Sequence, residues 1–118
     1  MGFEQYHEPV QELPEHTRTF AHMIISLIEE AEAIDWYEQR MAVEKNVEAA
    51  AIMADAQEEE FKHFGMDLAF LLRQSPKWDA TLRRILFKSG DIVKLGKQGE
   101  DAGENAPSDP TSQATEHS

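Results

Sequence analysis

Glu60 and His63 are the residues whose types and spacing most directly suggest chemistry. They lie in the stretch EEEFKHF, residues 58–64, and their i, i+3 spacing places both side chains on one face of a helix. Carboxylate-bridged di-iron bundles hold metal with this Glu-x-x-His arrangement. Glu4 and His7 have the same spacing in a segment where no helix is indicated, so the spacing alone favours an ordinary surface pair.

Glu30 is a carboxylate that interrupts an apolar stripe. The stripe recurs at helical spacing through Phe20, Met23, Leu27, Ile34, Tyr37 and Met41. Glu30 lies three residues after Leu27 and four before Ile34, so it faces the same side as the stripe. A core-facing carboxylate costs several kcal/mol unless it is neutralised, and no Lys or Arg occupies the neighbouring stripe positions. A bound cation is the simplest explanation.

Glu30 and Glu60 stand at matching heights on either side of a turn at Lys45, because each is 15 residues from that turn. In an antiparallel hairpin that rises about 1.5 Å per residue, they lie at the same level. One chain then supplies two glutamates and a histidine, half of a full di-metal ligand set, and a two-fold dimer would supply the other half. Carboxylate and imidazole ligands without sulfur suit Fe, Mn or Zn and do not choose among them.

Two other features of the first helix each have two interpretations. Tyr37 lies seven residues after Glu30 on the same face, where it could hydrogen-bond a ligand carboxylate or be an ordinary core tyrosine. A different face carries Glu29, Glu32 and Trp36. If that face meets another subunit, it forms a second cation site. The residues alone favour a solvated acidic face with Trp36 as an interface anchor.

Two long helices must position these residues. Helical spacing without internal Gly or Pro predicts the first helix between Pro14 and Val43. Asn46 can cap a second helix that runs to Ser75, with Gly65 as an internal residue that weakens it without ending it. Because the turn between the helices is only a few residues long, we expect them to pack antiparallel.

A third, shorter helix follows the hairpin. Ser75 and Pro76 begin it, residues 77–88 form it and Gly90 closes it, with DIVKL, residues 91–95, adding a last turn. No alternation typical of strands occurs, so the predicted class is all-α: an antiparallel two-helix hairpin plus a short third helix. Such a hairpin buries one stripe per helix, and a second copy of the chain would complete a four-helix bundle by dimerisation.

The expected domain layout has three parts. Residues 1–13 are an N-terminal segment, 14–95 a helical domain and 96–118 a disordered acidic tail. From Gln98 to Ser118 there are five acidic residues, no Lys or Arg, no aromatic residue and no large aliphatic residue. Such a composition cannot bury enough apolar surface to fold.

Charge and composition exclude several classes of function. Asp and Glu outnumber Lys and Arg by 23 to 11, giving a formal charge of −12, which disfavours nucleic acids and anionic membranes as partners. The absence of cysteine removes thiolate metal sites, disulfides and cysteine nucleophiles. Neither a secretory signal nor an apolar run long enough to cross a bilayer is present, so we expect a cytosolic protein without a membrane partner.

Four stretches of the sequence resemble one family. They are HEP near the start, SLIEEAEAIDWYEQR at 26–40, EEEFKHFGMDLAFLLR at 58–73 and KWDATLRRILF at 77–87. Over residues 7–95, in order and spacing, the sequence resembles the encapsulated ferritins, the ferritin-like cargo proteins of encapsulin nanocompartments. The stretch EE-x-E-A-x-D-W-Y joined to a later E-x-x-H is specific to this resemblance.

The resemblance implies a ferritin-like protomer whose dimer interface builds a di-iron ferroxidase centre, with dimers closing into a ring of ten chains. The iron ligands would be Glu30, Glu60 and His63, with Tyr37 close by. A peripheral site where metal enters, which could also hold calcium or another divalent cation, would consist of Glu29, Glu32 and Trp36. The implied reaction is oxidation of Fe(II) to Fe(III) by dioxygen for iron storage inside a cytoplasmic encapsulin shell, which is the implied partner.

Two positions depart from the family's pattern. Asp55 stands where members often place a histidine that joins a peripheral metal site. The C-terminal SDPTSQATEHS contains nothing apolar enough to dock into an encapsulin wall, so we expect either a shortened chain or a different mode of targeting. The alternative function is a non-catalytic metal-binding helical assembly or an iron-carrier module.

Overall fold

The computed structural model describes residues 6–110, and those residues contain helices and no strand. The elements are the 3-10 helix η1 (Val10–Glu12) and the α-helices α1 (Glu15–Val43), α2 (Val47–Gln74), α3 (Pro76–Arg83) and α4 (Ile92–Glu104). The predicted all-α class is confirmed. The described residues divide after Phe70 into two compact units.

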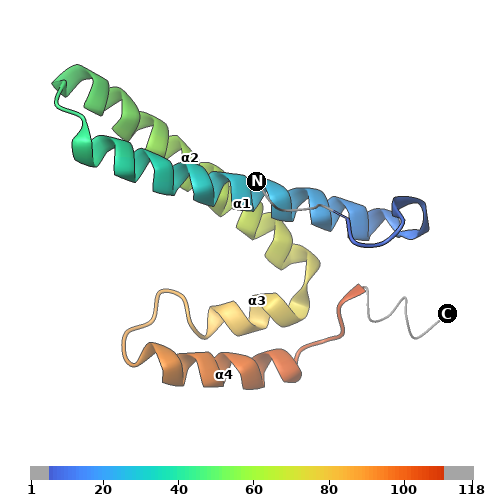
Figure 1. The fold of residues 1–118 in the computed structure, drawn as a ribbon. Helices are drawn as coiled ribbons and strands as arrows, with labels where there is room; N and C mark the ends of the chain where they lie inside the picture. The colour runs from blue at the N-terminus through green and yellow to red at the C-terminus, as the bar shows by residue number, and fades with distance from the viewer. Residues whose placement is uncertain (1–5, 111–118) are drawn as a thin grey trace. The chain divides into compact units, whose positions relative to one another are not determined.

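The first unit is built on a helical hairpin, in which α1 and α2 run antiparallel (Figure 1). The helix α1 begins directly after Pro14, whose φ of −59° suits the start of a helix. The connection is short, and Asn46 ends it by accepting a hydrogen bond through Oδ1 from the backbone N–H of Ala49, at 2.8 Å. Both predicted long helices and the predicted cap are therefore confirmed, and Gly65 does not interrupt α2.

Gln57 fixes the alignment of the two long helices. Its side chain is only 8% exposed, and its Nε2 donates to the backbone oxygen of Ile34 at 3.1 Å and to Oε1 of Glu38 at 2.9 Å. Ile34 lies one turn after Glu30, and Gln57 lies one turn before Glu60. The two hydrogen bonds therefore hold the level at which Glu30 and Glu60 face each other.

The hairpin buries little apolar surface in one protomer. No residue of α1 is buried, and α2 exposes Val47, Ile52, Phe61 and Met66 by more than half. Monomeric proteins seldom leave so much apolar side-chain surface of a helix uncovered. A second copy of the chain would cover such a surface, as the sequence predicts.

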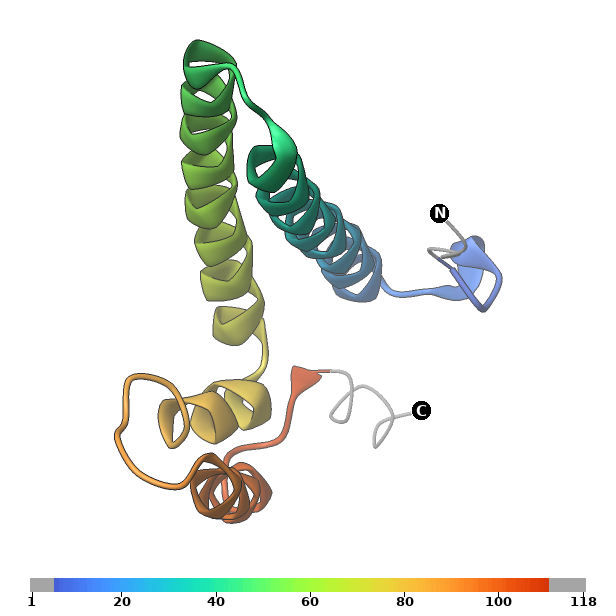
Figure 2. The ribbon, with the colours of Figure 1, turned by 60° about the vertical axis from the view of Figure 1, so that its left-hand side comes forward.

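The second unit contains α3 and α4, which lie side by side in Figures 1 and 2. Ser75 caps α3 as predicted, because its Oγ accepts from the backbone N–H of Trp78 at 3.1 Å, and Pro76 is the first helical residue. The prediction that the helix continues to residue 88 is wrong, since α3 ends at Arg83. The chain must turn back for α4 to pack on α3, and Phe87, with φ 62°, cannot continue a right-handed helix.

The helix α4 replaces much of the predicted tail. Asp91 caps it, since its Oδ1 accepts from the backbone N–H groups of Val93 at 2.9 Å and Lys94 at 3.1 Å. The expectation of disorder from residue 96 is therefore wrong as far as Glu104, where α4 ends. The predicted disordered tail also includes residues 111–118, which lie outside the described residues.

Two glycines explain why α4 packs so closely against α3. A Cβ atom on Gly99 would lie 2.6 Å from the backbone oxygen of Thr81, and one on Gly103 would meet Oγ1 of the same threonine. Both glycines are buried and lie four residues apart, on one face of α4. In a segment predicted to be disordered, these glycines therefore permit close contact between two helices.

We expect Gly99→Ala to destabilise the protein by about 1–3 kcal/mol, because the added methyl group has to displace backbone. Gly96→Ala is the matched control: nothing lies within 4 Å of a Cβ atom there, so the better helix propensity of alanine should stabilise α4 by about 0.5–1 kcal/mol. Urea unfolding measures both. Equal effects of the two substitutions would contradict this packing.

Asp109 fastens the chain beyond α4 to the start of α3. Its Oδ2 accepts from the hydroxyl of Ser75 at 2.6 Å, and its Oδ1 accepts from the backbone N–H of Lys77 at 3.1 Å. A carboxylate at this position also interacts favourably with the positive end of the helix dipole.

Candidate metal centre

Three side chains of the hairpin converge on one point. Glu30 comes from α1, and Glu60 and His63 come from α2. One ligand atom from each of the three lies within 4.8 Å of the other two. The structure therefore brings together the three residues that the sequence predicts as metal ligands.

The convergence follows from helix geometry. Glu60 and His63 are three residues apart and therefore share a face of α2. Glu30 reaches them because the two helices are antiparallel and the hydrogen bonds of Gln57 hold them in register. The equal separation of Glu30 and Glu60 from Lys45 in the sequence therefore predicts correctly that the two residues lie at the same height along the hairpin.

Glu60 and His63 are also joined to each other. Nδ1 of His63 lies 3.2 Å from Oε1 of Glu60, a hydrogen-bonding distance that orients the imidazole ring. The side chain of His63 is 43% exposed and that of Glu60 is 22% exposed, so the site opens on the surface of the protomer. A second protomer placed over this opening would exclude water from the site.

Glu30 is the unusual member of the group. Its Oε2 is buried and has no hydrogen-bond partner. The pKa of Glu30 is raised from 4.5 to about 7. Burial is the largest cause, followed by Asp67, which accepts a hydrogen bond from the protonated form and repels the charged form. The charges of Glu60 and Glu29 contribute less.

Asp67 is a residue of this region that the sequence analysis missed. It is only 9% exposed, and its Oδ2 is buried without a hydrogen-bond partner. The signal was present, because Asp67 lies four residues after His63 and seven after Glu60, on the same face of the helix.

The remaining predicted site residues also lie on α1. Tyr37 is half-buried, and its ring lies 5.6 Å from the guanidinium carbon of Arg40. That guanidinium carbon also lies 6.0 Å from the ring of Trp36, which is 49% exposed. Glu29 is exposed and Glu32 half-buried, so this acidic face remains accessible to solvent.

The residues present fit a hard or borderline divalent metal ion. Two carboxylates and one imidazole are the ligand types that iron, manganese and zinc accept. The unpartnered buried oxygen of Glu30 gives a second reason, because a buried carboxylate without a donor is costly until a cation or a proton reaches it.

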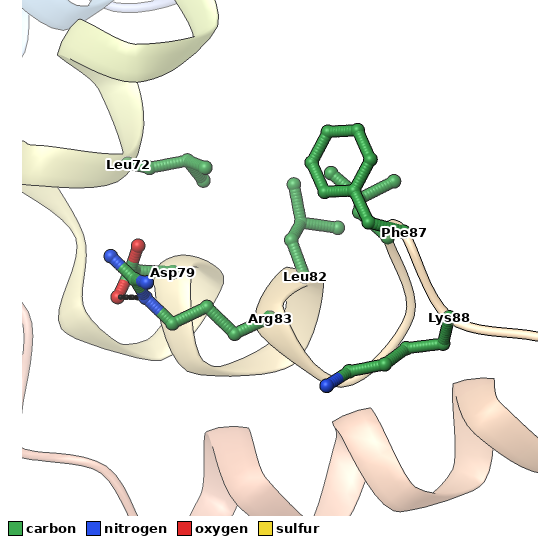
Figure 3. A pocket seen from close by; sticks show the side chains of 7 residues that line it. Leu72, Asp79, Leu82, Arg83, Phe87 and Lys88 are labelled. Atoms are coloured by element: carbon green, nitrogen blue, oxygen red, sulfur yellow. Dashed lines mark hydrogen bonds and ion pairs between the residues drawn. The ribbon is translucent and has the colours of Figure 1, made fainter.

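A pocket in the second unit offers no comparable chemistry. It has a volume of about 550 Å³ and is lined mainly by Leu72, Leu82, Leu86 and Phe87 (Figure 3). Its one carboxylate, Asp79, is paired with Arg83 at 2.8 Å. The pocket is therefore apolar with a satisfied ion pair, and it lacks a set of metal ligands.

The raised pKa of Glu30 predicts how the metal-free protein responds to pH. Between about pH 4.5 and 7 the folded protein holds a proton on Glu30 that the unfolded chain has lost. The free energy of unfolding should therefore increase as the pH falls from about 7.5 to 5.5. Chemical unfolding in the presence of a chelator measures this change. Glu30→Gln should show a smaller increase, and an identical pH dependence in that variant would contradict the assignment.

The described helices include none that is both long enough and apolar enough to cross a membrane. The curated proteins similar to this chain include the "Ferritin-like protein" of Thermotoga maritima, 38% identical over 90% of this chain and 93% of that protein. The "Encapsulated ferritin-like protein" of Rhodospirillum rubrum is also 38% identical, over 92% of this chain and 77% of that protein.

A solved structure agrees with these relatives. The crystal structure of protein ne0167 from Nitrosomonas europaea is 41% identical and has a TM-score of 0.74, covering 76% of this chain and 99% of that one. The sequence model of the family described as EncFtn-like matches residues 5–89, which is most of the chain. The chain is therefore a member of the EncFtn-like family of encapsulated ferritin-like proteins.

Proposed function

We propose that this protein is a ferroxidase, which oxidises Fe(II) to Fe(III) with dioxygen at a di-iron centre shared between two protomers. The observation that carries the proposal is the convergence of Glu30, Glu60 and His63 within 4.8 Å in a protomer of this family. Three donors per chain are half of what two metal ions need in carboxylate-bridged bundles.

Each ligand has a distinct task. The carboxylates of Glu30 and Glu60 favour Fe(III) over Fe(II), because the product ion is harder and more highly charged. His63, oriented by Glu60, supplies the nitrogen ligand. Two Fe(II) ions held together can each give up one electron, so that dioxygen accepts both.

A symmetric dimer would complete both the metal centre and the apolar core. The centre opens on the protomer surface at His63, which is 43% exposed, and α1 has no buried residue. A partner on this face would cover the exposed side chains of Ile52 and Met66, which helical spacing places on the His63 face of α2, and would bring the second set of ligands. By family resemblance, the dimers would close into a decameric ring.

The encapsulin shell is the proposed partner and the place where oxidised iron would be stored. The relative from Rhodospirillum rubrum is named as encapsulated, which supports this location. On the outer face, Glu29, Glu32 and Trp36 would form a peripheral site for incoming metal. That site could also take calcium, because its carboxylates supply oxygen ligands.

Crystals of the oligomer loaded with Fe(II) would test the proposal through anomalous scattering at the iron edge. We expect two iron ions on a dimer axis between paired copies of Glu30, Glu60 and His63, together with dioxygen-dependent oxidation in solution. Metal found only near Glu29 and Glu32, or tight binding without oxidation, would leave a non-catalytic metal-binding assembly.

A further inference from the structure

Asp67 is a buried carboxylate that is not a ligand of the proposed ferroxidase centre. It is nine-tenths buried in α2, and its Oδ2 has no hydrogen-bond partner. It follows His63 by one helical turn, on the face that carries Glu60. A residue that only stabilised the fold would not be an acid here, since a buried, unpaired carboxylate is destabilising.

Glu30 carries the second buried oxygen of this kind. Its Oε2 lacks a donor, and its carboxylate interacts directly with that of Asp67. Two ionised carboxylates can only accept hydrogen bonds, so they cannot satisfy each other. The charged groups that raise the pKa of Glu30 are the carboxylates of Asp67, Glu60 and Glu29. Lys62, five residues before Asp67 in α2, is paired with Glu59 at 2.8 Å.

We propose that Asp67 is a further metal ligand, which forms with Glu30 an inner position for a hard divalent cation. The two unpartnered oxygens of these residues would bind the ion, and water would complete its coordination. With oxygen ligands and no imidazole, the position should prefer Mn²⁺, Mg²⁺, Ca²⁺ or Fe²⁺ to softer ions.

The inner position is a neighbour of the ferroxidase centre and distinct from it. Asp67 is not part of the group whose ligand atoms lie within 4.8 Å of one another, whereas Glu30 is. The inference rests on the proposed function in that Glu30 serves both positions. Binding of an ion that is stable in air near neutral pH can test it without any oxidation step.

Mn²⁺ is a suitable probe, because it prefers oxygen ligands and its free form is counted by electron paramagnetic resonance. The full chain is titrated as wild type, Asp67→Asn and Glu58→Gln. Glu58 is exposed on the same helix, so its substitution removes the same charge from a place without the buried pair. We expect Asp67→Asn to lose one Mn²⁺ per protomer, or to bind it about tenfold or more weakly. Glu58→Gln should match the wild type.

Unfolding temperatures in chelator exclude loss of the fold as the cause. Asp67→Asn should unfold at the same temperature as the wild type or higher, because a buried charge is removed. If that variant does not fold, Asp67→Ser and a manganese-edge anomalous map of the wild type decide the question. An anomalous peak between Glu30 and Asp67 is expected.

Unchanged Mn²⁺ number and affinity in Asp67→Asn would overturn the inference and would leave the ferroxidase proposal standing if Fe(II) is still oxidised. Failure of the ferroxidase proposal has a different signature: Mn²⁺ is lost in Asp67→Asn, but the wild type does not oxidise Fe(II).

Discussion

Glu30→Gln should lower the rate of dioxygen-dependent Fe(II) oxidation by about 100-fold or more, while the protein remains folded. The substitution keeps the size of the side chain and removes the charge that holds metal. Because Glu30 is the one ligand that α1 contributes to the group of three, neither Glu60 nor His63 can replace it. Formation of Fe(III), followed by absorbance under air and corrected for oxidation in buffer alone, measures the rate.

The matched control for this experiment is Glu58→Gln, which removes an exposed carboxylate from α2. Its rate should lie within about twofold of the wild type, since surface charges have little effect at a distance. In chelator, Glu30→Gln should be at least as stable as the wild type at pH 7.5, because it removes a buried carboxylate without a partner. If Glu30→Gln oxidised Fe(II) at the wild-type rate, the reaction would have to occur at another site.

Metal ions that bind at the dimer interface should increase the association constant of the protomers. The increase should be about 100-fold for each bound ion when the free metal concentration is 100 times the dissociation constant of that site. At the proposed interface, carboxylates from two chains approach each other and repel until cations neutralise them. Sedimentation of dilute protein in chelator and in Fe(II) without oxygen would measure the shift. Oxygen is excluded so that assembly is observed apart from oxidation.

His63→Ala is the variant that separates metal-linked assembly from simple hydrophobic association. It keeps the exposed apolar residues of α2 and loses one metal ligand per chain, so its association should respond only weakly to Fe(II). Identical size distributions of the wild type in chelator and in Fe(II) would contradict metal-linked assembly.

The hairpin and the level of the metal centre could be predicted from the sequence because both depend on local rules. Helical spacing defined α1 and α2, the side chain of Asn46 marked the start of α2, and a constant rise per residue placed Glu30 opposite Glu60. The family resemblance pointed to the same residues. Ligand roles and the peripheral acidic site stay predictions.

The region after α3 could not be predicted, because its structure depends on contacts between helices. Gly99 and Gly103 weaken a helix by propensity, and only their fit against Thr81 makes them favourable. The sequence prediction includes Asp91 in a last turn of the third helix, although an aspartate before an apolar pair is a good N-cap. A local signal therefore marks the start of α4, whereas the continuation of α4 through two glycines depends on contacts with α3.

Asp67 was missed for another reason: its importance comes from its burial beside Glu30, on the other helix. Spacing placed it on the correct face, as it does many acidic residues of an acidic helix. Only the structure distinguishes Asp67, which is buried, from Glu58 and Glu59, which are exposed.

Among the described residues, Leu71 is the one apolar side chain that is fully buried. A protomer with so small a core exposes little additional apolar surface when it unfolds. Its heat capacity of unfolding should then fall below the roughly 12–15 cal/mol/K per residue of ordinary domains, and its stability should vary only weakly with temperature. Most of the heat-capacity change would accompany association, so cooling should weaken the assembly of protomers more than the folding of each protomer.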